Sequence, residues 1–153
     1  MQEGTPGKLI SALFRYGRAY LTEQLEPFNI GGGQFWLLFI LYQRDGLTQE
    51  ELSGLLNVDK STTARFIAKL EKAGYISKKL NEKDLRAKRI FLTRKAKELE
   101  PQMNFIPDNW NKILSAGMTE KEVETVLTLL TKMADNAAGY LDKNKGERNE
   151  TTK

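Results

Sequence analysis

The sequence predicts a mainly helical fold with one small β-hairpin wing, an α+β architecture in which the hairpin directly follows two short helices. Three observations support this prediction. Apolar residues recur every three or four positions in six stretches, which is typical of helices. They alternate with polar residues in two stretches between residues 75 and 93, which is typical of strands. With 153 residues, 40% of them hydrophobic, the chain can bury the core of one domain or of a tightly joined pair.

The first two predicted helices lie before residue 46. An apolar face with helical spacing indicates an amphipathic helix that ends at Pro27. This face consists of Ile10, Leu13, Phe14, Gly17, Leu21 and Leu25. After flexible glycines at 31–33, the run from Gln34 to Arg44 is apolar on nearly all sides, which predicts a short helix buried on several sides. Gly46 is the predicted stop of this second helix.

A pair of short helices is predicted next. Thr48 and Glu51 have the spacing of a capping box, so a third helix is expected to start at Thr48. Asp59 is a favourable N-cap for a fourth helix, which we expect from Lys60 to Ala73. Gly74 is expected to end this fourth helix in the left-handed conformation.

The predicted hairpin has strands from Tyr75 to Leu80 and from Ala87 to Thr93, and the charged loop from Asn81 to Arg86 joins them. Helical periodicity returns after Thr93. Pro101 and Pro107 interrupt it, and interior prolines kink or break helices. The sequence therefore leaves the path of the fifth helix open.

A last amphipathic helix is predicted to begin at a second capping box, formed by Thr119 and Glu122. It carries a broad apolar stripe from Val123 to Leu141. Residues 143–153 include no apolar side chain, so we expect a disordered tail there.

Two short helices joined by a brief turn and followed at once by a hairpin have the order of a winged helix-turn-helix. In this arrangement the second helix fits a DNA major groove about 12 Å wide, and the hairpin tip reaches beside it. The charge distribution supports this interpretation. Residues 46–95 contain 12 Lys and Arg against 6 Asp and Glu, a net charge of +6, whereas the rest of the chain has 12 against 14. A solvated helix face without a ligand is the competing interpretation of these cations.

The wing also carries the residues that resemble a known family. The run from Asp84 to Thr93 is an Asp-x-Arg pair followed by an apolar strand that ends in Leu-Thr, and it is similar to the wing signature of the MarR family. Residues 59–62 and 70–76 resemble the family's recognition helix and its exit. Thr63 departs from the pattern, because the family usually has a larger aliphatic residue there. The resemblance covers residues 9–141.

This resemblance implies a triangular homodimer that binds double-stranded DNA, often with a small-molecule pocket between the dimer part and the DNA-binding lobe. The dimerisation region is predicted at residues 1–45 and 94–142, and the DNA-binding lobe at residues 46–93. The resemblance also implies that Arg86 enters the minor groove, whose negative potential attracts a guanidinium. Asp84 would hold Arg86 by a charge-assisted hydrogen bond, or serve as a turn-forming residue.

The predicted DNA contacts lie on the third and fourth helices and on the wing: Thr48, Gln49, Lys60, Ser61, Thr62, Arg65, Lys69, Lys83, Asp84, Arg86 and Lys88. Five aromatic residues are candidates for a pocket that takes a small aromatic or amphipathic ligand: Phe14, Phe35, Trp36, Phe39 and Trp110. Ordinary core and dimer-interface packing is the alternative for these aromatics, and their helical spacing favours it.

Composition excludes several classes of function. The chain has no Cys and no His, which excludes disulfides, thiolate metal sites, thiol redox switches and imidazole catalysis. No phosphate-binding glycine loop or carboxylate pair presents itself, so neither an enzyme nor a cofactor is expected. The longest apolar run, Phe35 to Tyr42, is far shorter than the ~20 residues of a membrane span.

The N-terminus does not resemble a secretory signal, so we expect a cytoplasmic protein. The resulting hypothesis is a sequence-specific transcriptional regulator, a repressor at a near-palindromic operator. A winged-helix module that binds protein and not DNA is the alternative.

Overall fold

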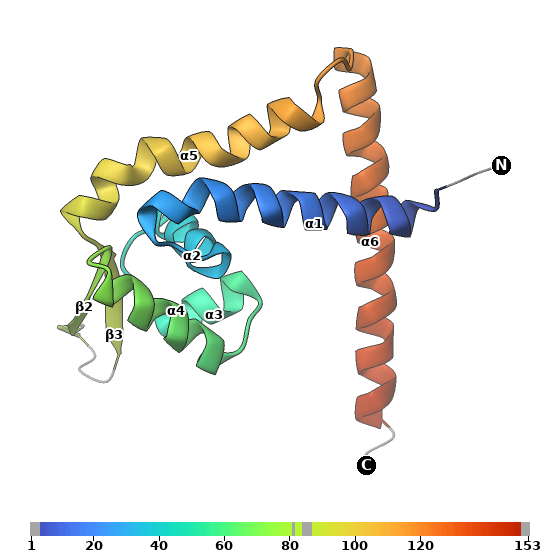
Figure 1. The fold of residues 1–153 in the computed structure, drawn as a ribbon. Coiled ribbons are helices and arrows are strands. Elements are labelled where there is room, and N and C mark those ends of the chain that lie inside the picture. Colours follow the sequence, from blue (N-terminus) through green and yellow to red (C-terminus); the bar gives the residue numbers. More distant parts are fainter. Residues whose placement is uncertain (1–3, 81, 84–86, 151–153) are drawn as a thin grey trace. The chain divides into compact units, whose positions relative to one another are not determined.

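The computed structural model describes residues 4–80, 82–83 and 87–150, with side chains as far as residue 143. This part of the chain forms two compact units, of which the first ends at Asn111 and the second begins at Lys112. The first unit starts with α1 (Pro6–Leu25), the 3₁₀ helix η1 (Glu26–Phe28), α2 (Gly32–Gln43), β1 (Leu47–Thr48) and α3 (Gln49–Leu56). It continues with α4 (Lys60–Lys72), β2 (Ile76–Leu80), β3 (Lys88–Leu92) and most of α5 (Arg94–Leu114) (Figure 1). The predicted fold class, mainly helical with a small hairpin, is confirmed.

A three-stranded antiparallel sheet has the strand order β1-β3-β2. β2 and β3 form the predicted hairpin, with Ile76 opposite Leu92 and Leu80 opposite Lys88. β1, in which Leu47 lies opposite Ile90, was not predicted. Two residues are too few to show the alternation that indicates a strand, so β1 is defined only by its pairing with β3.

The core of the first unit forms around α2. Phe35, Leu37, Leu38 and Leu41 of this helix are buried, which confirms the prediction of a helix buried on several sides. α2 packs against α1, α3, α4 and β3. It lies in the predicted dimerisation region, residues 1–45, but most of these contacts are with the helix-turn-helix and the sheet. Each large apolar side chain buried here contributes roughly 1.5–3 kcal/mol, so α2 provides a rigid support for α3 and α4.

One of the glycines at the start of α2, Gly33, has a packing role that the sequence did not indicate. Gly33 lies in the first turn of α2, and the ring of Phe66 from α4 lies directly against it. A Cβ at residue 33 would overlap this ring well inside van der Waals contact. Gly33 therefore permits the close approach of α2 and α4.

Most helix ends follow the predicted capping residues. The Glu51 carboxylate accepts from the backbone N–H of Thr48 at 2.8 Å, and the Thr48 hydroxyl accepts from the backbone N–H of Glu51 at 3.2 Å, which confirms the first capping box. Gly74 follows α4 with a φ of +79°, as predicted. Gly46 also has a positive φ, +74°, but α2 ends three residues earlier. The prediction that Gly46 stops this helix is wrong, because its N–H donates to Ile90 beside β1.

α5 is a single helix that includes both Pro101 and Pro107 (Figure 1). Each proline removes one backbone donor and crowds the preceding turn, which weakens a helix locally. The apolar side of α5 compensates, because Ala96, Leu99, Met103 and Ile106 are buried. This settles the path that the sequence left open.

The second unit contains α6 (Glu120–Glu150). Its predicted capping box is confirmed, since the Thr119 backbone N–H donates to the Glu122 carboxylate at 2.7 Å and the reverse contact is also made. The disordered tail predicted from residue 143 differs from the structure, in which α6 continues to Glu150. Lys, Glu and Arg are good helix formers, and extending an existing helix needs no new nucleus. The large apolar side chains of α6 are exposed: Val126, Leu127, Leu129, Leu130, Met133, Tyr140 and Leu141.

Candidate nucleic-acid interface

α3 and α4 form a helix-turn-helix with a tightly specified turn. Asn57 adopts the left-handed conformation, φ +52°, at the end of α3. The backbone N–H of Val58 then donates to the carbonyl of Ser53 at 3.3 Å. Asp59 caps α4, because its carboxylate accepts from the backbone N–H of Thr62 at 2.7 Å. These contacts set the angle at which α4 leaves the turn.

A buried hydrogen bond joins the two helices. The Ser53 hydroxyl donates to the Thr63 hydroxyl at 2.9 Å, and Thr63 donates in turn to the carbonyl of Asp59 at 3.0 Å. Thr63 is fully buried, and its hydroxyl has a partner both as donor and as acceptor inside the protein. The larger aliphatic residue expected at this position would leave the Ser53 hydroxyl without its acceptor. The pair therefore accounts for the departure that the sequence showed at Thr63.

α4 presents its polar side to solvent. Thr63, Ile67 and Leu70 are buried, whereas the side chains of Lys60, Ser61, Arg65, Lys69 and Lys72 are exposed and Thr62 is half-buried. The hydroxyl of Thr62 is already engaged with Asp59 and Arg65. Four of the predicted DNA contacts, Lys60, Ser61, Arg65 and Lys69, therefore lie on the solvent side. Four cations therefore share the solvent side of α4.

The two ends of α4 have different surroundings. Gln49 of α3 donates to the carbonyl of Lys60 in the first turn of α4 at 3.3 Å. Lys69 and Lys72 border a surface hollow of about 670 Å³ with the end of α1, η1 and the start of α2. At 1.5 Å per residue, Lys72 lies roughly 16 Å along the axis from Ser61. The early and late residues of α4 can therefore meet different parts of a long ligand.

The start of α5 holds the C-terminal end of α4. Lys95 Nζ donates to the carbonyl of Ala73 at 2.7 Å and lies 4.3 Å from the centre of the Tyr75 ring. The Thr93 hydroxyl donates to the carbonyl of Gly74 at 2.7 Å. A cation is favourable at this end because it complements the helix dipole. These contacts join residues about twenty positions apart and were not predicted.

The wing brings further predicted contacts to the same lobe. Lys83 and Lys88 are exposed, and Lys88 begins β3. The predicted contacts Asp84 and Arg86 lie outside the described residues. One surface hollow of about 390 Å³ is bordered by Thr48, Gln49, Glu50, Ala87 and Lys88. The structure thus places the start of α3 beside the start of β3.

A charged cluster that was not predicted ties β3 to the start of α3. Arg89 Nη1 donates to the carbonyl of Gly46 at 2.7 Å and lies 3.9 Å from the Glu51 carboxylate. Arg44 lies 3.2 Å from the other oxygen of that carboxylate. The pKa of Glu51 lies below its ordinary value, mainly because the backbone N–H of Thr48 donates to it, with help from both arginines. Glu51 therefore stays ionised at neutral pH.

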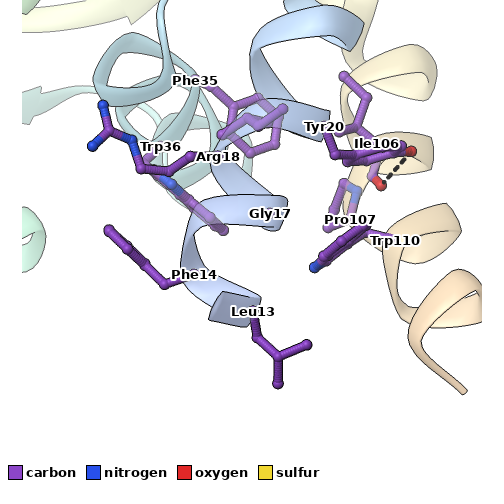
Figure 2. Close-up of a pocket in the computed structure, with 11 residues that line it drawn as sticks. Leu13, Phe14, Gly17, Arg18, Tyr20, Phe35, Trp36, Ile106, Pro107 and Trp110 are labelled. Carbon is purple, nitrogen blue, oxygen red and sulfur yellow. Dashed lines mark hydrogen bonds between the residues drawn. The ribbon is translucent and has the colours of Figure 1, made fainter. Parts of the chain in front are cut away.

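A second candidate site is an apolar cavity of about 250 Å³ between α1, α2 and α5 (Figure 2). Phe14, Phe35, Trp36 and Trp110 of the predicted aromatic set line it, whereas Phe39 does not and packs near Phe35 and Trp36. The other lining residues are Leu13, Gly17, Arg18, Tyr20, Leu21, Ile106 and Pro107. The aromatic walls suit a flat apolar molecule.

Few polar groups reach this cavity. Tyr20 stacks on Trp110 with ring centres 5.0 Å apart, and its hydroxyl donates to Ile106 and accepts from Asn109. Arg18 adds a cation to the wall (Figure 2), 5.9 Å from the centre of the Phe14 ring. The four-residue spacing of these two side chains on α1 could have indicated Arg18 from the sequence. Trp110 of α5 was in the predicted set, whereas Ile106 and Pro107 of the same helix were not.

Comparison with known proteins identifies the fold. The MarR family model matches residues 32–88, from the start of α2 to the start of β3. An uncharacterized HTH-type transcriptional regulator of Bacillus subtilis (strain 168), YybA, is 31% identical over 113 residues, which are 74% of this chain and 75% of the relative. This chain belongs to the MarR family.

Solved MarR structures share its architecture. A MarR transcriptional regulator from Methanosarcina mazei Go1 is 44% identical and has a TM-score of 0.77, with 86% of this chain and 95% of that chain covered. A mutant MarR from E. coli complexed with operator DNA is 26% identical and has a TM-score of 0.73, with 83% and 91% covered. The winged helix-turn-helix predicted from the sequence is therefore confirmed.

As a member of the MarR family, the chain is a DNA-binding transcriptional regulator and not an enzyme. Among the residues that the structure describes, no helix has the length and apolar character needed to cross a membrane. In the same part of the chain, no group of three or more acidic side chains is placed to hold a metal ion.

Proposed function

We propose that this MarR-family regulator is a homodimeric repressor that occupies a near-palindromic operator, with α4 of each protomer in the major groove and each wing beside it. The observation that carries the proposal is the solvent side of α4, where Lys60, Arg65, Lys69 and Lys72 are exposed on a helix whose other side is buried. Such a repressor acts by covering its site on chromosomal DNA, so we place it in the cytoplasm.

Base readout and phosphate binding are assigned to different parts of this lobe. The N-terminal half of a recognition helix meets the base edges, which places Ser61 and Arg65 nearest to them. Lys69, one turn further along, is assigned to a phosphate, as are Thr48, Gln49 and Lys88 around the hollow beside the wing. Arg86 is assigned to the minor groove, where negative potential is concentrated.

Two substitutions test this assignment. Lys69→Ala should weaken binding to operator and random duplex alike and reduce the salt slope by about one, because one counterion fewer is released. Arg86→Ala should weaken operator binding by roughly 1–3 kcal/mol, comparable to one good groove contact. Titration of both variants over a salt series measures these effects. An unchanged affinity of Arg86→Ala at moderate salt would remove the wing from the mechanism.

The homodimer is proposed from apolar surfaces that each unit leaves exposed. Leu127 and Leu130 of α6 are 62% and 41% exposed, and Leu9 and Leu13 of α1 are 59% and 44% exposed. Exposed apolar surface of this extent marks interaction sites. A second copy is the proposed cover, because a near-palindromic site requires two recognition helices related by a two-fold axis.

Sedimentation velocity at micromolar concentration tests the dimer. Leu130→Glu should shift the protein toward monomer, because a charge at a buried interface is unfavourable. Thr128→Glu adds the same charge on the opposite side of α6 and should leave a dimer. A wild-type monomer with intact helices would contradict the proposal.

A small aromatic or amphipathic ligand in the cavity of Figure 2 is proposed to release the operator. The support is the aromatic lining, which includes Trp36 and Trp110, the two tryptophans of the chain. Intrinsic fluorescence therefore reports directly on an occupant, with anilinonaphthalene sulfonate as the probe.

Filling the cavity provides the control for this proposal. Gly17→Leu should abolish the fluorescence response to the probe, because residue 17 lines the cavity and its Cβ would lie 3.5 Å from Trp110. Gly7→Leu, on the same helix with open space around it, should respond as the wild type does. Equal responses of both variants would place the probe elsewhere and refute this site.

A further inference from the structure

We infer that Thr62 is a positioning residue that orients the Arg65 guanidinium toward a guanine of the operator, with Asp59 setting the direction of the Thr62 hydroxyl. This inference deepens the proposed function and rests on it. It states that Arg65 contacts a base and that Thr62 holds the Arg65 side chain in the orientation needed for that contact.

The three side chains form a directed chain of hydrogen bonds along the first turns of α4. One oxygen of Asp59 accepts from the backbone N–H of Thr62 at 2.7 Å, and the other accepts from the Thr62 hydroxyl at 2.7 Å. The hydroxyl has a single proton and has donated it, so only its lone pairs remain. Arg65 Nη2 donates to that oxygen at 3.3 Å. The hydrogen bonds therefore run in one direction, in which Arg65 donates to Thr62 and Thr62 donates to Asp59.

This arrangement places the guanidinium at the end of α4 that is proposed to enter the groove. Helical side chains lean toward the helix N-terminus, so Arg65 reaches back over the turn that contains Thr62. One of its five N–H groups is engaged with Thr62, and the others remain to meet a ligand. A planar fork of donors matches the O6 and N7 acceptors of guanine in the major groove. The geometry therefore favours guanine over the other bases for Arg65.

The role of Asp59 explains how a carboxylate is tolerated on this face. Both of its oxygens are occupied by Thr62, and its charge lies at the positive end of the α4 dipole. The pKa of Asp59 lies below its ordinary value, chiefly because the backbone N–H of Thr62 donates to it. The carboxylate thus stays ionised at neutral pH and keeps Thr62 as an acceptor for Arg65.

The test begins with the full-length wild type, whose preferred duplex is selected from a random pool by binding and sequencing. Each guanine of that duplex is then replaced, one at a time, by 7-deazaguanine, which lacks the N7 acceptor. We expect one guanine in each half-site at which wild-type affinity falls roughly tenfold, toward the lower end of the range for a bidentate base contact, because the O6 acceptor remains. The Arg65→Ala variant should bind the duplex with guanine and the duplex with 7-deazaguanine at that position with equal affinity.

Thr62→Val and Thr62→Ser separate positioning from helix stability. Valine keeps the shape of threonine and the Asp59 cap on the backbone, but it cannot accept a hydrogen bond from Arg65. The ratio of the affinity for the guanine duplex to that for the 7-deazaguanine duplex should therefore fall to about threefold or less. Serine retains the hydroxyl and should keep the wild-type ratio. The double variant Thr62→Val/Arg65→Ala should show no further change beyond Arg65→Ala. Lys72→Ala removes a charge at the far end of α4 and should lower affinity for both duplexes alike.

Each outcome decides the inference. A full wild-type ratio in Thr62→Val, or additive effects of the two substitutions, would overturn the role of Thr62. A retained ratio in Arg65→Ala would overturn guanine readout by Arg65. If Thr62→Val lowers affinity equally for every duplex, its role is structural only, and the inference is wrong. A wild type with no preferred duplex would instead refute the proposed function, and this appears before any variant is made.

Discussion

Replacing Gly33 by alanine should lower the stability of this protein, although alanine is the better helix former. The change places a methyl group inside the contact between α2 and the Phe66 ring of α4. Relief requires either displacement of α4 or rotation of the half-buried ring into solvent, which costs about 1–3 kcal/mol by comparison with other overpacked cores. Alanine recovers less than about 1 kcal/mol of helix propensity near a helix end. We therefore expect a net loss of about 1–2 kcal/mol in the free energy of unfolding.

Chemical denaturation followed by circular dichroism measures this loss, at one fixed protein concentration because association adds to apparent stability. Gly54→Ala is the matched control. Gly54 lies in α3, and a Cβ there meets nothing within 4 Å, so the same substitution should stabilise by about 0.5–1 kcal/mol. Adding Phe66→Leu to Gly33→Ala should restore part of the loss. If both alanine variants stabilise the protein equally, the reasoning about α2 and α4 fails.

Three further predictions concern side-chain contacts that stabilise α3 and α4. Lys95→Met should destabilise by about 0.3–1 kcal/mol at low salt, because it removes the cation at the end of α4, whereas the exposed Lys97→Met should be neutral. The depressed pKa of Glu51 means that its stabilising effect is complete above pH 4.5 and is lost as the pH falls through the lower, folded value. The stability difference between wild type and Glu51→Gln should therefore shrink in acid, and a constant difference would contradict this. Thr63→Val should cost about 1–3 kcal/mol by leaving Ser53 without an acceptor. Adding Ser53→Ala should recover part of that cost, and no recovery would contradict the buried pair.

Features that depend on neighbouring residues were predictable from the sequence. The capping boxes at Thr48 and Thr119, the N-cap Asp59 and the glycine after α4 all act within a few positions of the chain. Of the predicted DNA contacts on α4, Lys60, Ser61, Arg65 and Lys69 are exposed. These signals were enough for the order of the helices and the hairpin, for the winged helix-turn-helix and for the basic face of α4.

Features that join distant residues required the tertiary structure. β1 is defined only by its pairing with β3, and α5 remains one helix through two prolines because its apolar side is buried. The cluster of Arg44, Glu51 and Arg89 and the cavity between α1, α2 and α5 combine side chains that no local spacing relates.

The sequence alone thus determined most of the helices, the hairpin, the caps at Thr48, Asp59 and Thr119 and the charged side of α4, because hydrogen bonds and periodicity within one segment suffice for these. Only the tertiary structure decided which carbonyl Lys95 meets, why Gly33 must lack a side chain, and which aromatics line one cavity. The reason is physical. These contacts follow from how closely whole helices pack, and that distance depends on every side chain in the shared core at once.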